Sequence, residues 1–275
     1  MIDDFIQNEL NFFKPMSERQ HLATIEMRER WKSETLIERQ ERVSLETYDL
    51  CKGIVKYGLF EGLKLTRDPR WGKLDLGSQC LGLYEREILQ YLSLIIAGKY
   101  KTFIDIGAAD GYYSTGMLFT GLVEKAICFE ISEAGQKLIE LNWLENGNPG
   151  ILEVFGEANA FTLMDLPSEN FSKALILIDI EGYEFDLLTL DLIERLKASD
   201  VIIEIHNWVE DFESKYRKLL KNLSRYFKIE VMERLERPTA NITELRSYTD
   251  DNRLLLTSER RPCLMRFLKL VPLIA

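Results

Sequence analysis

The sequence contains no Gly-x-Gly-x-x-Gly motif, the loop with which dinucleotide-binding folds bring their backbone up to a pyrophosphate. It also contains no Cys-x-x-Cys pair. The four cysteines are widely separated along the chain: Cys51, Cys80, Cys128 and Cys263. This spacing favours reduced thiols in the core of a cytoplasmic protein.

Long apolar runs are absent as well, and none reaches the length of a membrane span. The chain opens with Met1-Ile-Asp-Asp, which lacks the basic residues of a signal peptide, so we expect a cytoplasmic protein. Positive charge is scarce, since 35 Lys and Arg face 45 Asp and Glu, a formal net charge of −10. This balance argues against nucleic acid as a partner, because its phosphates would meet no general attraction.

The C-terminal stretch is a local exception to the acidic composition. Its basic residues are Arg253, Arg260, Arg261, Arg266 and Lys269. Two interpretations stay open for this stretch. It is either the solvated edge of a strand or a landing site for an anionic substrate such as a sugar phosphate.

One segment is more informative than any other. Residues 102–106 form a short apolar run that is typical of a buried parallel strand, and small residues follow at Gly107, Ala108 and Gly111. The chain then has helix-compatible composition. A strand that turns through small residues into a helix marks the ligand-binding edge of an open α/β sheet. Gly107 and Ala108 leave room there for a ligand to lie against the backbone.

The acids of this turn favour S-adenosylmethionine over a dinucleotide as the ligand. Asp105 precedes the turn and Asp110 lies within it, so a pyrophosphate would meet carboxylates and be repelled. S-adenosylmethionine has an ammonium, a sulfonium, a ribose and an adenine but no phosphate, and acids can surround it. A nicotinamide-dependent oxidoreductase is therefore the weaker alternative, because it requires the missing glycine motif.

The next two apolar segments bring further acids to the same edge. Residues 125–131 read as a second strand, and the carboxylate of Glu130 near its end can accept both ribose hydroxyls. Residues 151–158 read as a third strand, in which Glu157 can accept the adenine amino group beside the backbone N–H of Ala158. The candidate cofactor-binding residues are Asp105, Gly107, Ala108, Asp110, Gly111, Tyr113, Glu130, Ile131, Glu157, Ala158 and Asp179.

Two later strands end in candidate catalytic residues, which are Asp179, Glu181, Glu204 and His206. His206 is the first choice as general base for a hydroxyl acceptor, because an ordinary imidazole pKa suits the task, and Asp179 is its competitor. In a second mechanism, Asp179, Glu204 and His206 hold a divalent cation such as Mg or Mn that lowers the pKa of the hydroxyl. We expect the metal-independent route.

Four stretches match a known family in content and order. They include Phe103-Ile-Asp-Ile-Gly-Ala-Ala-Asp-Gly-Tyr-Tyr-Ser114 and the box Asp179-x-Glu181-Gly182-x-Glu184. Over residues 100–210 the chain resembles the class I S-adenosylmethionine-dependent methyltransferases, and more narrowly the FkbM-type family. The resemblance implies a Rossmann-like α/β fold with a doubly wound sheet of seven strands. It also implies O-methylation of a hydroxyl on a sugar, glycan or related small molecule, as in polysaccharide or natural-product modification.

The chain divides into an N-terminal part, residues 1–98, and a methyltransferase domain, residues 99–275. The N-terminal part reads as a helical extension followed by a small hairpin within residues 54–85. Its first 50 residues are either a cap packed on the core or the arm of a homodimer. Residues 236–257 form a polar insertion before the last strand and a candidate lid over the ligand edge. A non-catalytic alternative also stays open, in which the fold binds the nucleoside and serves as a scaffold through its N-terminal helices.

Overall fold

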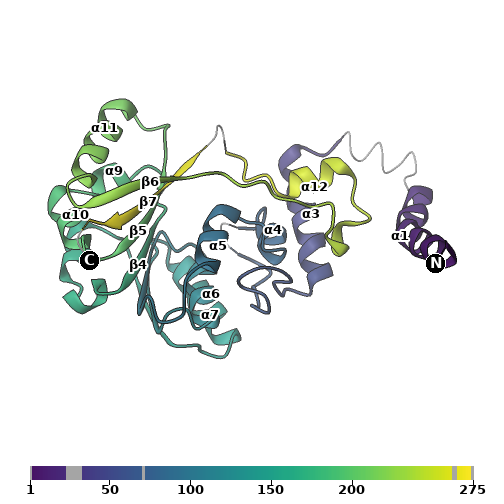
Figure 1. The fold of residues 1–275 in the computed structure, drawn as a ribbon, viewed down its shortest axis with the longest axis horizontal. Coiled ribbons are helices and arrows are strands. Elements are labelled where there is room, and N and C mark those ends of the chain that lie inside the picture. Colours follow the sequence, from purple (N-terminus) through teal and green to yellow (C-terminus); the bar gives the residue numbers. More distant parts are fainter. Residues whose placement is uncertain (1, 23–32, 70–71, 262–264, 274–275) are drawn as a thin grey trace.

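The computed structural model describes residues 2–22, 33–69, 72–261 and 265–273, and its strands form one seven-stranded sheet (Figure 1). The strands are β1 (Thr102–Ile106), β2 (Lys125–Phe129), β3 (Ile151–Phe155), β4 (Ala174–Ile178), β5 (Asp200–Ile205), β6 (Phe227–Met232) and β7 (Arg266–Pro272). Their order is β3-β2-β1-β4-β5-β7-β6, with β1 to β5 parallel and β7 antiparallel to both of its neighbours. This arrangement confirms the predicted Rossmann-like sheet of the class I methyltransferase fold.

Helices precede β1 and connect the strands that follow. The α-helices are α1 (Ile2–Leu22), α3 (Leu36–Cys51), α4 (Leu76–Cys80), α5 (Arg86–Ser93), α6 (Tyr112–Phe119), α7 (Glu133–Glu145), α8 (Ala160–Asp165), α9 (Glu184–Leu187), α10 (Leu190–Leu196), α11 (Phe212–Leu223) and α12 (Asp250–Leu256). Two 3₁₀ turns are η1 (Ser168–Phe171) and η2 (Thr243–Leu245). Within the described residues, no helix combines the length and the apolar character needed to cross a membrane.

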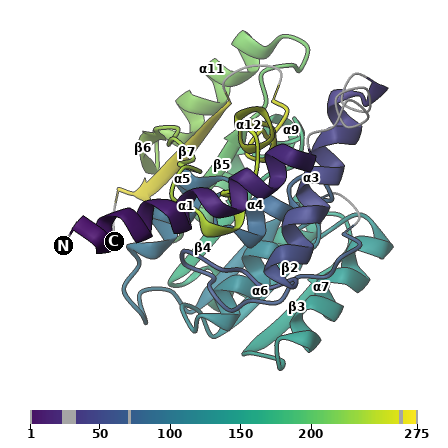
Figure 2. The same ribbon diagram turned by 90° about the vertical axis from the view of Figure 1, so that its right-hand side faces the viewer.

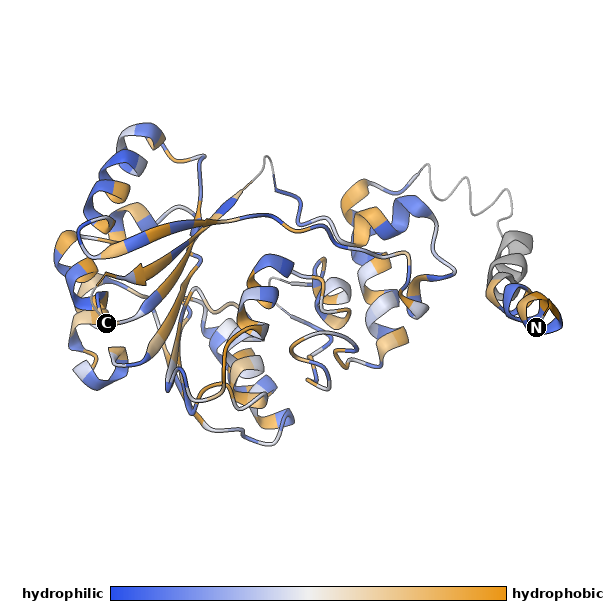
Figure 3. Ribbon diagram, viewed as in Figure 1, coloured by the Kyte–Doolittle hydropathy of each residue, from blue (hydrophilic) through white to orange (hydrophobic). Residues whose placement is uncertain are grey.

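Alternate side chains of the strands point to opposite faces of the sheet, and each face is covered by its own helices. Phe103 of β1 lies in an apolar core with α3, α4, α5 and α6, whereas Ile104 and Ile106 lie in a second core with α8, α10 and α11. All five residues of β1 and all five of β4 are buried, as expected for parallel strands covered on both faces. Figure 3 shows apolar residues concentrated along the central strands. The sheet is therefore doubly wound, as predicted.

Helix α3 packs the N-terminal extension onto the body of the protein. It begins at a capping box, in which Thr35 and Glu38 each accept the other's backbone N–H. Val43 and Cys51 on its buried face belong to the same apolar core as Phe103 of β1. This helix is thus a cap on the core, while the division of the chain at residue 98 stays a prediction.

Helix α1 exposes apolar side chains in the part whose side chains are described. Ile2, Phe5, Ile6 and Leu10 lie at the spacing of one helix face, and each is between 47% and 66% exposed. A stripe of this kind is what a dimer arm would need. The homodimer stays a prediction.

The burial of the described cysteines agrees with the expectation that they are thiols in the core. Cys51, Cys80 and Cys128 are buried free thiols, and Cys263 lies outside the described residues. The three described cysteines therefore pack as small apolar side chains.

The hairpin predicted within residues 54–85 is only partly present. One antiparallel bridge joins Ile54 to Lys64, and the later part of the segment forms helix α4 instead of a strand. The reason is a close helix contact, since a Cβ on Gly77 of α4 would lie 2.9 Å from the Cα of Ser44 in α3. The glycine that interrupts the strand-like pattern thus lets α4 pack against α3.

Helices α5 and α10 begin at different kinds of residue. Glu85, before α5, has a left-handed backbone with φ of 39°. Thr189 lies between α9 and α10, and its side chain caps α10.

The insertion at residues 236–257 folds against the N-terminal extension. It contains η2 and α12, and α12 lies beside α3 in both views (Figures 1 and 2). Arg39 of α3 donates to Asn252 of α12 at 2.8 Å, and Gln40 donates to the carbonyl of Ser258 at 2.6 Å. The candidate lid is therefore attached to the helical cap.

The turn after β1 requires a glycine at position 107. Gly107 has φ of 90°, and a Cβ there would lie 1.8 Å from the carbonyl oxygen of Asp179, the residue after β4. The N–H groups of Gly107 and Ala108 both donate to the carbonyl of Phe129 in β2, at 2.9 and 3.0 Å. The loop is thus fixed between the ends of β2 and β4.

We predict that Gly107→Ala destabilises the protein much more than Gly98→Ala. Both glycines have a positive φ, but a Cβ at Gly98 meets no atom within 4 Å. Strain alone costs about 1 kcal/mol at Gly98, whereas strain plus the clash with Asp179 costs roughly 3 kcal/mol or more at Gly107. Urea unfolding of both variants measures the difference, and equal losses would contradict the close packing of this turn.

Candidate active site

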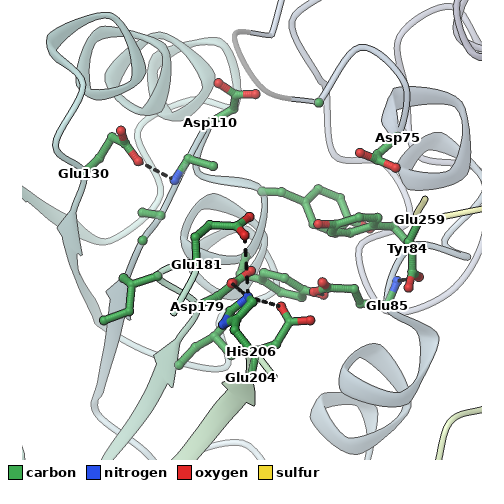
Figure 4. A pocket seen from close by; sticks show the side chains of 18 of the residues that line it. Asp75, Tyr84, Glu85, Asp110, Glu130, Asp179, Glu181, Glu204, His206 and Glu259 are labelled. Atoms are coloured by element: carbon green, nitrogen blue, oxygen red, sulfur yellow. Dashed lines mark hydrogen bonds and ion pairs between the residues drawn. The ribbon is translucent and has the colours of Figure 1, made fainter. Parts of the chain in front are cut away.

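The carboxyl ends of β1 to β5 surround a cavity of about 830 Å³ (Figure 4). Its walls come from the loops after these strands, from the segment around α4 and from the segment before β7. The predicted site residues that line it are Gly107, Ala108, Asp110, Tyr113, Glu130, Ile131, Glu157, Ala158, Asp179, Glu181, Glu204 and His206. We call the part formed after β1 to β3 the nucleoside half and the part formed after β4 and β5 the acceptor half.

Glu130 is the fixed acid of the nucleoside half. Its buried carboxylate accepts the backbone N–H of Ala109 at 3.0 Å and that of Ser132 at 2.8 Å. Gly135 in α7 provides the space, because a Cβ there would lie 2.7 Å from the Cγ of Glu130. Glu130 thus ties two loops together, and its remaining lone pairs are available to a diol.

The rim of the nucleoside half has an apolar surface beside the carboxylate of Glu157. Ile131 is 72% exposed at this rim, and Glu157 is exposed next to the half-buried Ala158. Phe129 and Phe155 stack nearby, with ring centroids 5.3 Å apart. Such an apolar surface suits a flat heterocycle whose amino group donates a hydrogen bond to a carboxylate.

Two predicted cofactor-binding residues, Asp105 and Gly111, lie behind the cavity wall. Asp105 is 3% exposed and accepts a hydrogen bond from Ser114 of α6. Gly111 precedes α6 with φ of 77°, and a Cβ there would lie 3.1 Å from Ile139 of α7. Neither residue lines the cavity among the described residues, so both support the loop from behind.

A buried carboxylate orients the imidazole of the acceptor half. Glu184 is fully buried and accepts the backbone N–H of His206 and that of Gly182, each at 2.9 Å. Its two oxygens also lie 3.2 and 3.3 Å from Nδ1 of His206. Burial lowers the pKa of His206, but the hydrogen bond and charge of Glu184 outweigh it and raise that pKa. Nε2 of the ring is left to face the cavity.

Three carboxylates surround Nε2 of His206. The nearest oxygens belong to Asp179 at 3.5 Å, Glu181 at 3.7 Å and Glu204 at 3.8 Å (Figure 4). Glu181 has a left-handed backbone with φ of 53°, a strained conformation for this residue type. Burial is the main cause that raises the pKa of Asp179. The acceptor half therefore concentrates negative charge around one imidazole.

Arg261 balances the acids of the innermost wall. Its guanidinium pairs with Glu204, with Glu85 at 2.9 Å and with Glu259 at 2.8 Å. Tyr113 also donates to Glu85 at 2.7 Å. Burial nevertheless raises the pKa of Glu85 to about 8. Of the acids around His206, Glu204 is thus the one already paired with an arginine.

Several basic residues of the C-terminal stretch are paired with acidic residues of the described part of the chain. Arg260 makes a bidentate pair with Asp75 at 2.7 and 3.0 Å, and Arg253 pairs with Asp250. Among the described residues, the cavity is lined by two arginines and by nine acidic residues: Asp75, Glu85, Asp110, Glu130, Glu157, Asp179, Glu181, Glu204 and Glu259. These arginines neutralise internal acids, so the cavity disfavours a sugar phosphate, and the landing-site interpretation stays an untested prediction.

Several residues that line the cavity were not identified from the sequence. They are Gly72, Asp75, Gln79, Tyr183, Trp208, Glu259 and Met265. Asp75 lies 185 positions from its partner Arg260, so no local pattern could connect them. Residues 236–257, all of which the structure describes, do not line the cavity. After this insertion, the lining residues begin at Glu259.

Comparisons with known proteins give only distant likenesses. No family model and no curated protein matches the chain. An rRNA methylase from Streptococcus thermophilus is similar over 66% of this chain and 92% of its own, with 11% identity and a TM-score of 0.44. A dimethyladenosine transferase from Plasmodium falciparum is similar over 69% of this chain and 62% of its own, with 18% identity and a TM-score of 0.44.

A third solved structure has the same character. A ribosomal protein L11 methylase from Lactobacillus delbrueckii subsp. bulgaricus is similar over 73% of this chain and 79% of its own, with 17% identity and a TM-score of 0.40. Likenesses this distant carry no argument about activity or substrate, and they add nothing specific to the FkbM-type resemblance. The strand order is the evidence for the fold, and the residues that line the cavity are the evidence for its chemistry.

We predict that Asp105→Asn removes a pH-dependent loss of stability. Burial raises the pKa of Asp105 from 3.8 to about 7. An acid whose pKa is higher in the folded state holds its proton more tightly there, so the free energy of unfolding falls as pH rises from about 4 to about 7. The variant should match the parent near pH 4 and exceed it above pH 7, by up to about 4 kcal/mol.

Urea unfolding at several pH values measures both proteins. The asparagine carbonyl can still accept from Ser114, so the local hydrogen bond is kept. Parallel pH profiles for the two proteins would contradict the raised pKa of Asp105.

Proposed function

We propose that the protein is an S-adenosylmethionine-dependent O-methyltransferase acting on a hydroxyl of a sugar, glycan or related small molecule. The observation that carries this proposal is one acid-lined cavity in which a nucleoside half adjoins an imidazole surrounded by carboxylates. Such a cavity can hold a cofactor and an acceptor side by side, and its acids favour ligands that carry no phosphate group. The resemblance to FkbM-type enzymes supports the same activity.

The donor set of the nucleoside half fits S-adenosylmethionine. Glu130 offers its carboxylate to the ribose hydroxyls, and the rim at Ile131 and Glu157 suits adenine. Asp110 and Asp179 supply negative charge for the ammonium and the sulfonium. When bound, this cofactor supplies a methyl group on a positively charged sulfur.

The acceptor half fits the task of activating a hydroxyl. Methyl transfer requires alignment of the acceptor with the sulfonium, and a hydroxyl benefits from a group that takes its proton. His206 presents Nε2 to the cavity because Glu184 holds the opposite ring nitrogen. His206 is the first candidate for the proton acceptor, and Asp179 at 3.5 Å is the second.

Glu130→Gln should weaken binding of S-adenosylhomocysteine roughly 10- to 100-fold, because a hydrogen bond to a charged acceptor contributes about 1.5–3 kcal/mol. Calorimetry measures the affinity of the parent and the variant. Glu153→Gln is the matched control, since Glu153 lies on the neighbouring strand β3, pairs with Lys125 and is outside the cavity lining. Equal affinities of the two variants would remove Glu130 from the ribose contact.

His206→Ala should reduce methyl transfer roughly 10²- to 10⁴-fold, the range for loss of a proton-transferring side chain. Its affinity for S-adenosylhomocysteine should stay near that of the parent, since the nucleoside half is untouched. A screen of phosphate-free sugars, glycosides and oligosaccharides with a labelled methyl donor provides the acceptor for this assay. Transfer at the parental rate in the variant would exclude the imidazole from the reaction.

The alternatives predict different binding. A scaffold would bind S-adenosylhomocysteine but transfer no label to any acceptor. A nicotinamide-dependent oxidoreductase would bind NAD instead, against the repulsion between its pyrophosphate and the cavity acids. The same repulsion disfavours a nucleic-acid acceptor, because the described lining of the cavity contains nine acidic residues and two arginines.

A further inference from the structure

Three potential ligand atoms of the acceptor half lie near one another. Asp179, Glu181 and His206 each offer one atom, and these atoms lie within 4.8 Å of one another. Asp179 and Glu181 follow β4, and His206 follows the adjacent strand β5. We call these three residues the Asp179–Glu181–His206 cluster.

The imidazole of this cluster is held as a metal-binding histidine usually is. The His206 residue is 2% exposed, and Glu184 holds its Nδ1 from the side away from the cavity. A proton on Nδ1 leaves the lone pair of Nε2 directed at the carboxylates of Asp179 and Glu181. Within the described residues, the ion pairs of Nε2 are to carboxylate oxygens at 3.5–3.8 Å.

An oxygen of Asp179 gives an independent sign of a missing positive partner. Its Oδ1 is inaccessible to water and has no hydrogen-bond partner in the part of the chain that the structure describes. A buried acceptor left without a partner costs about 1–3 kcal/mol. This oxygen is also the one that lies nearest Nε2 of His206.

Glu181 completes the cluster from the solvent side. Its side chain is 81% exposed, and its left-handed backbone, φ 53°, brings the carboxylate to 3.7 Å from Nε2. Strain of this kind is characteristic of functional sites. Glu204 lies almost as near, but Arg261 already neutralises it.

We infer that the Asp179–Glu181–His206 cluster binds a divalent transition-metal ion. The separations of Nε2 of His206 from the oxygens of Asp179 and Glu181, 3.5 and 3.7 Å, are close to the spacing of about 3.0–3.4 Å between ligands on an ion with bonds of about 2.1 Å. An imidazole with two carboxylates suits Mn²⁺, Fe²⁺ or Zn²⁺ better than Mg²⁺. Three protein ligands leave at least one coordination position open towards the cavity, as in catalytic sites.

The inference does not depend on methyl transfer, but it changes the roles of His206 and Asp179, since both candidates for the proton acceptor become metal ligands. With an ion on Nε2, His206 acts as a ligand and not as a proton acceptor. The competing account has no metal, and a protonated His206 balances the surrounding carboxylates instead. Direct binding measurements separate the two accounts.

The test is a titration of the full chain, stripped with a chelator, with Mn²⁺ observed by electron paramagnetic resonance. We expect one Mn²⁺ per chain, displaced by Zn²⁺ and not by an equal concentration of Mg²⁺. His206→Ala and Glu181→Gln should abolish this binding. Glu184→Gln should weaken it 10- to 100-fold, because Glu184 only orients the ligand.

Asp186→Asn is the matched control for the metal titration. Asp186 is an exposed acid of α9, two residues after Glu184, and it does not line the cavity. This variant should bind Mn²⁺ as the parent does. Glu181→Gln changes an exposed side chain and should stay folded, which circular dichroism checks.

Two results would overturn the inference. One is a folded parent that binds neither Mn²⁺ nor Zn²⁺ at millimolar concentration. The other is equal binding by the Asp186→Asn and Glu181→Gln variants, which would place the ion elsewhere. Calorimetry with S-adenosylhomocysteine on the same samples tests the proposed function separately, because nucleoside binding without metal binding, or the reverse, is readily distinguished.

Discussion

In the part of the chain that the structure describes, nine acidic residues line one cavity while two arginines balance them, and this excess of negative charge limits which ligands the cavity can hold. Like charges at short range are costly in a partly buried space, which is why burial and neighbouring charge raise the pKa values of Glu85 and Asp179. A ligand that carries positive charge lowers this cost, whereas one that carries phosphate increases it. The charge alone therefore favours a sulfonium cofactor over a dinucleotide, and it leaves room for a metal ion.

Glu184 connects this charge to the fold. It is fully buried, yet its carboxylate binds backbone N–H groups of two different strand ends, those at Gly182 and His206. Three partners for one carboxylate offset its desolvation, and the same contacts fix the position of the imidazole. The arrangement of the acceptor half thus follows from one buried side chain.

Much of the fold could be predicted because parallel strands covered on both faces appear in the sequence as short apolar runs. The carboxyl ends of such strands share one edge, so Glu130, Asp179 and His206 could be placed in one site before their contacts were known. Asp105 shows the limit of this reasoning. It lies inside β1 and not after it, so its side chain points to a face of the sheet and meets Ser114 of α6.

The parts that escaped prediction depend on contacts between distant segments. Arg260 meets Asp75 across 185 positions, and neither residue belongs to a periodic pattern. The segment of α4 has strand-like spacing, but its Gly77 fits against α3, and tertiary packing decided its conformation. Glu184 was visible as part of an acidic box, while its contacts with His206 required the strand ends to be in place.

The most direct test of the central claim is a crystal structure of the chain with S-adenosylhomocysteine. The account predicts the ribose hydroxyls on the carboxylate of Glu130, the adenine at the rim by Ile131 and Glu157, and the sulfur directed towards the imidazole of His206. A nucleoside bound at any other place on the chain, or a cavity that excludes it at saturating concentration, would contradict the account.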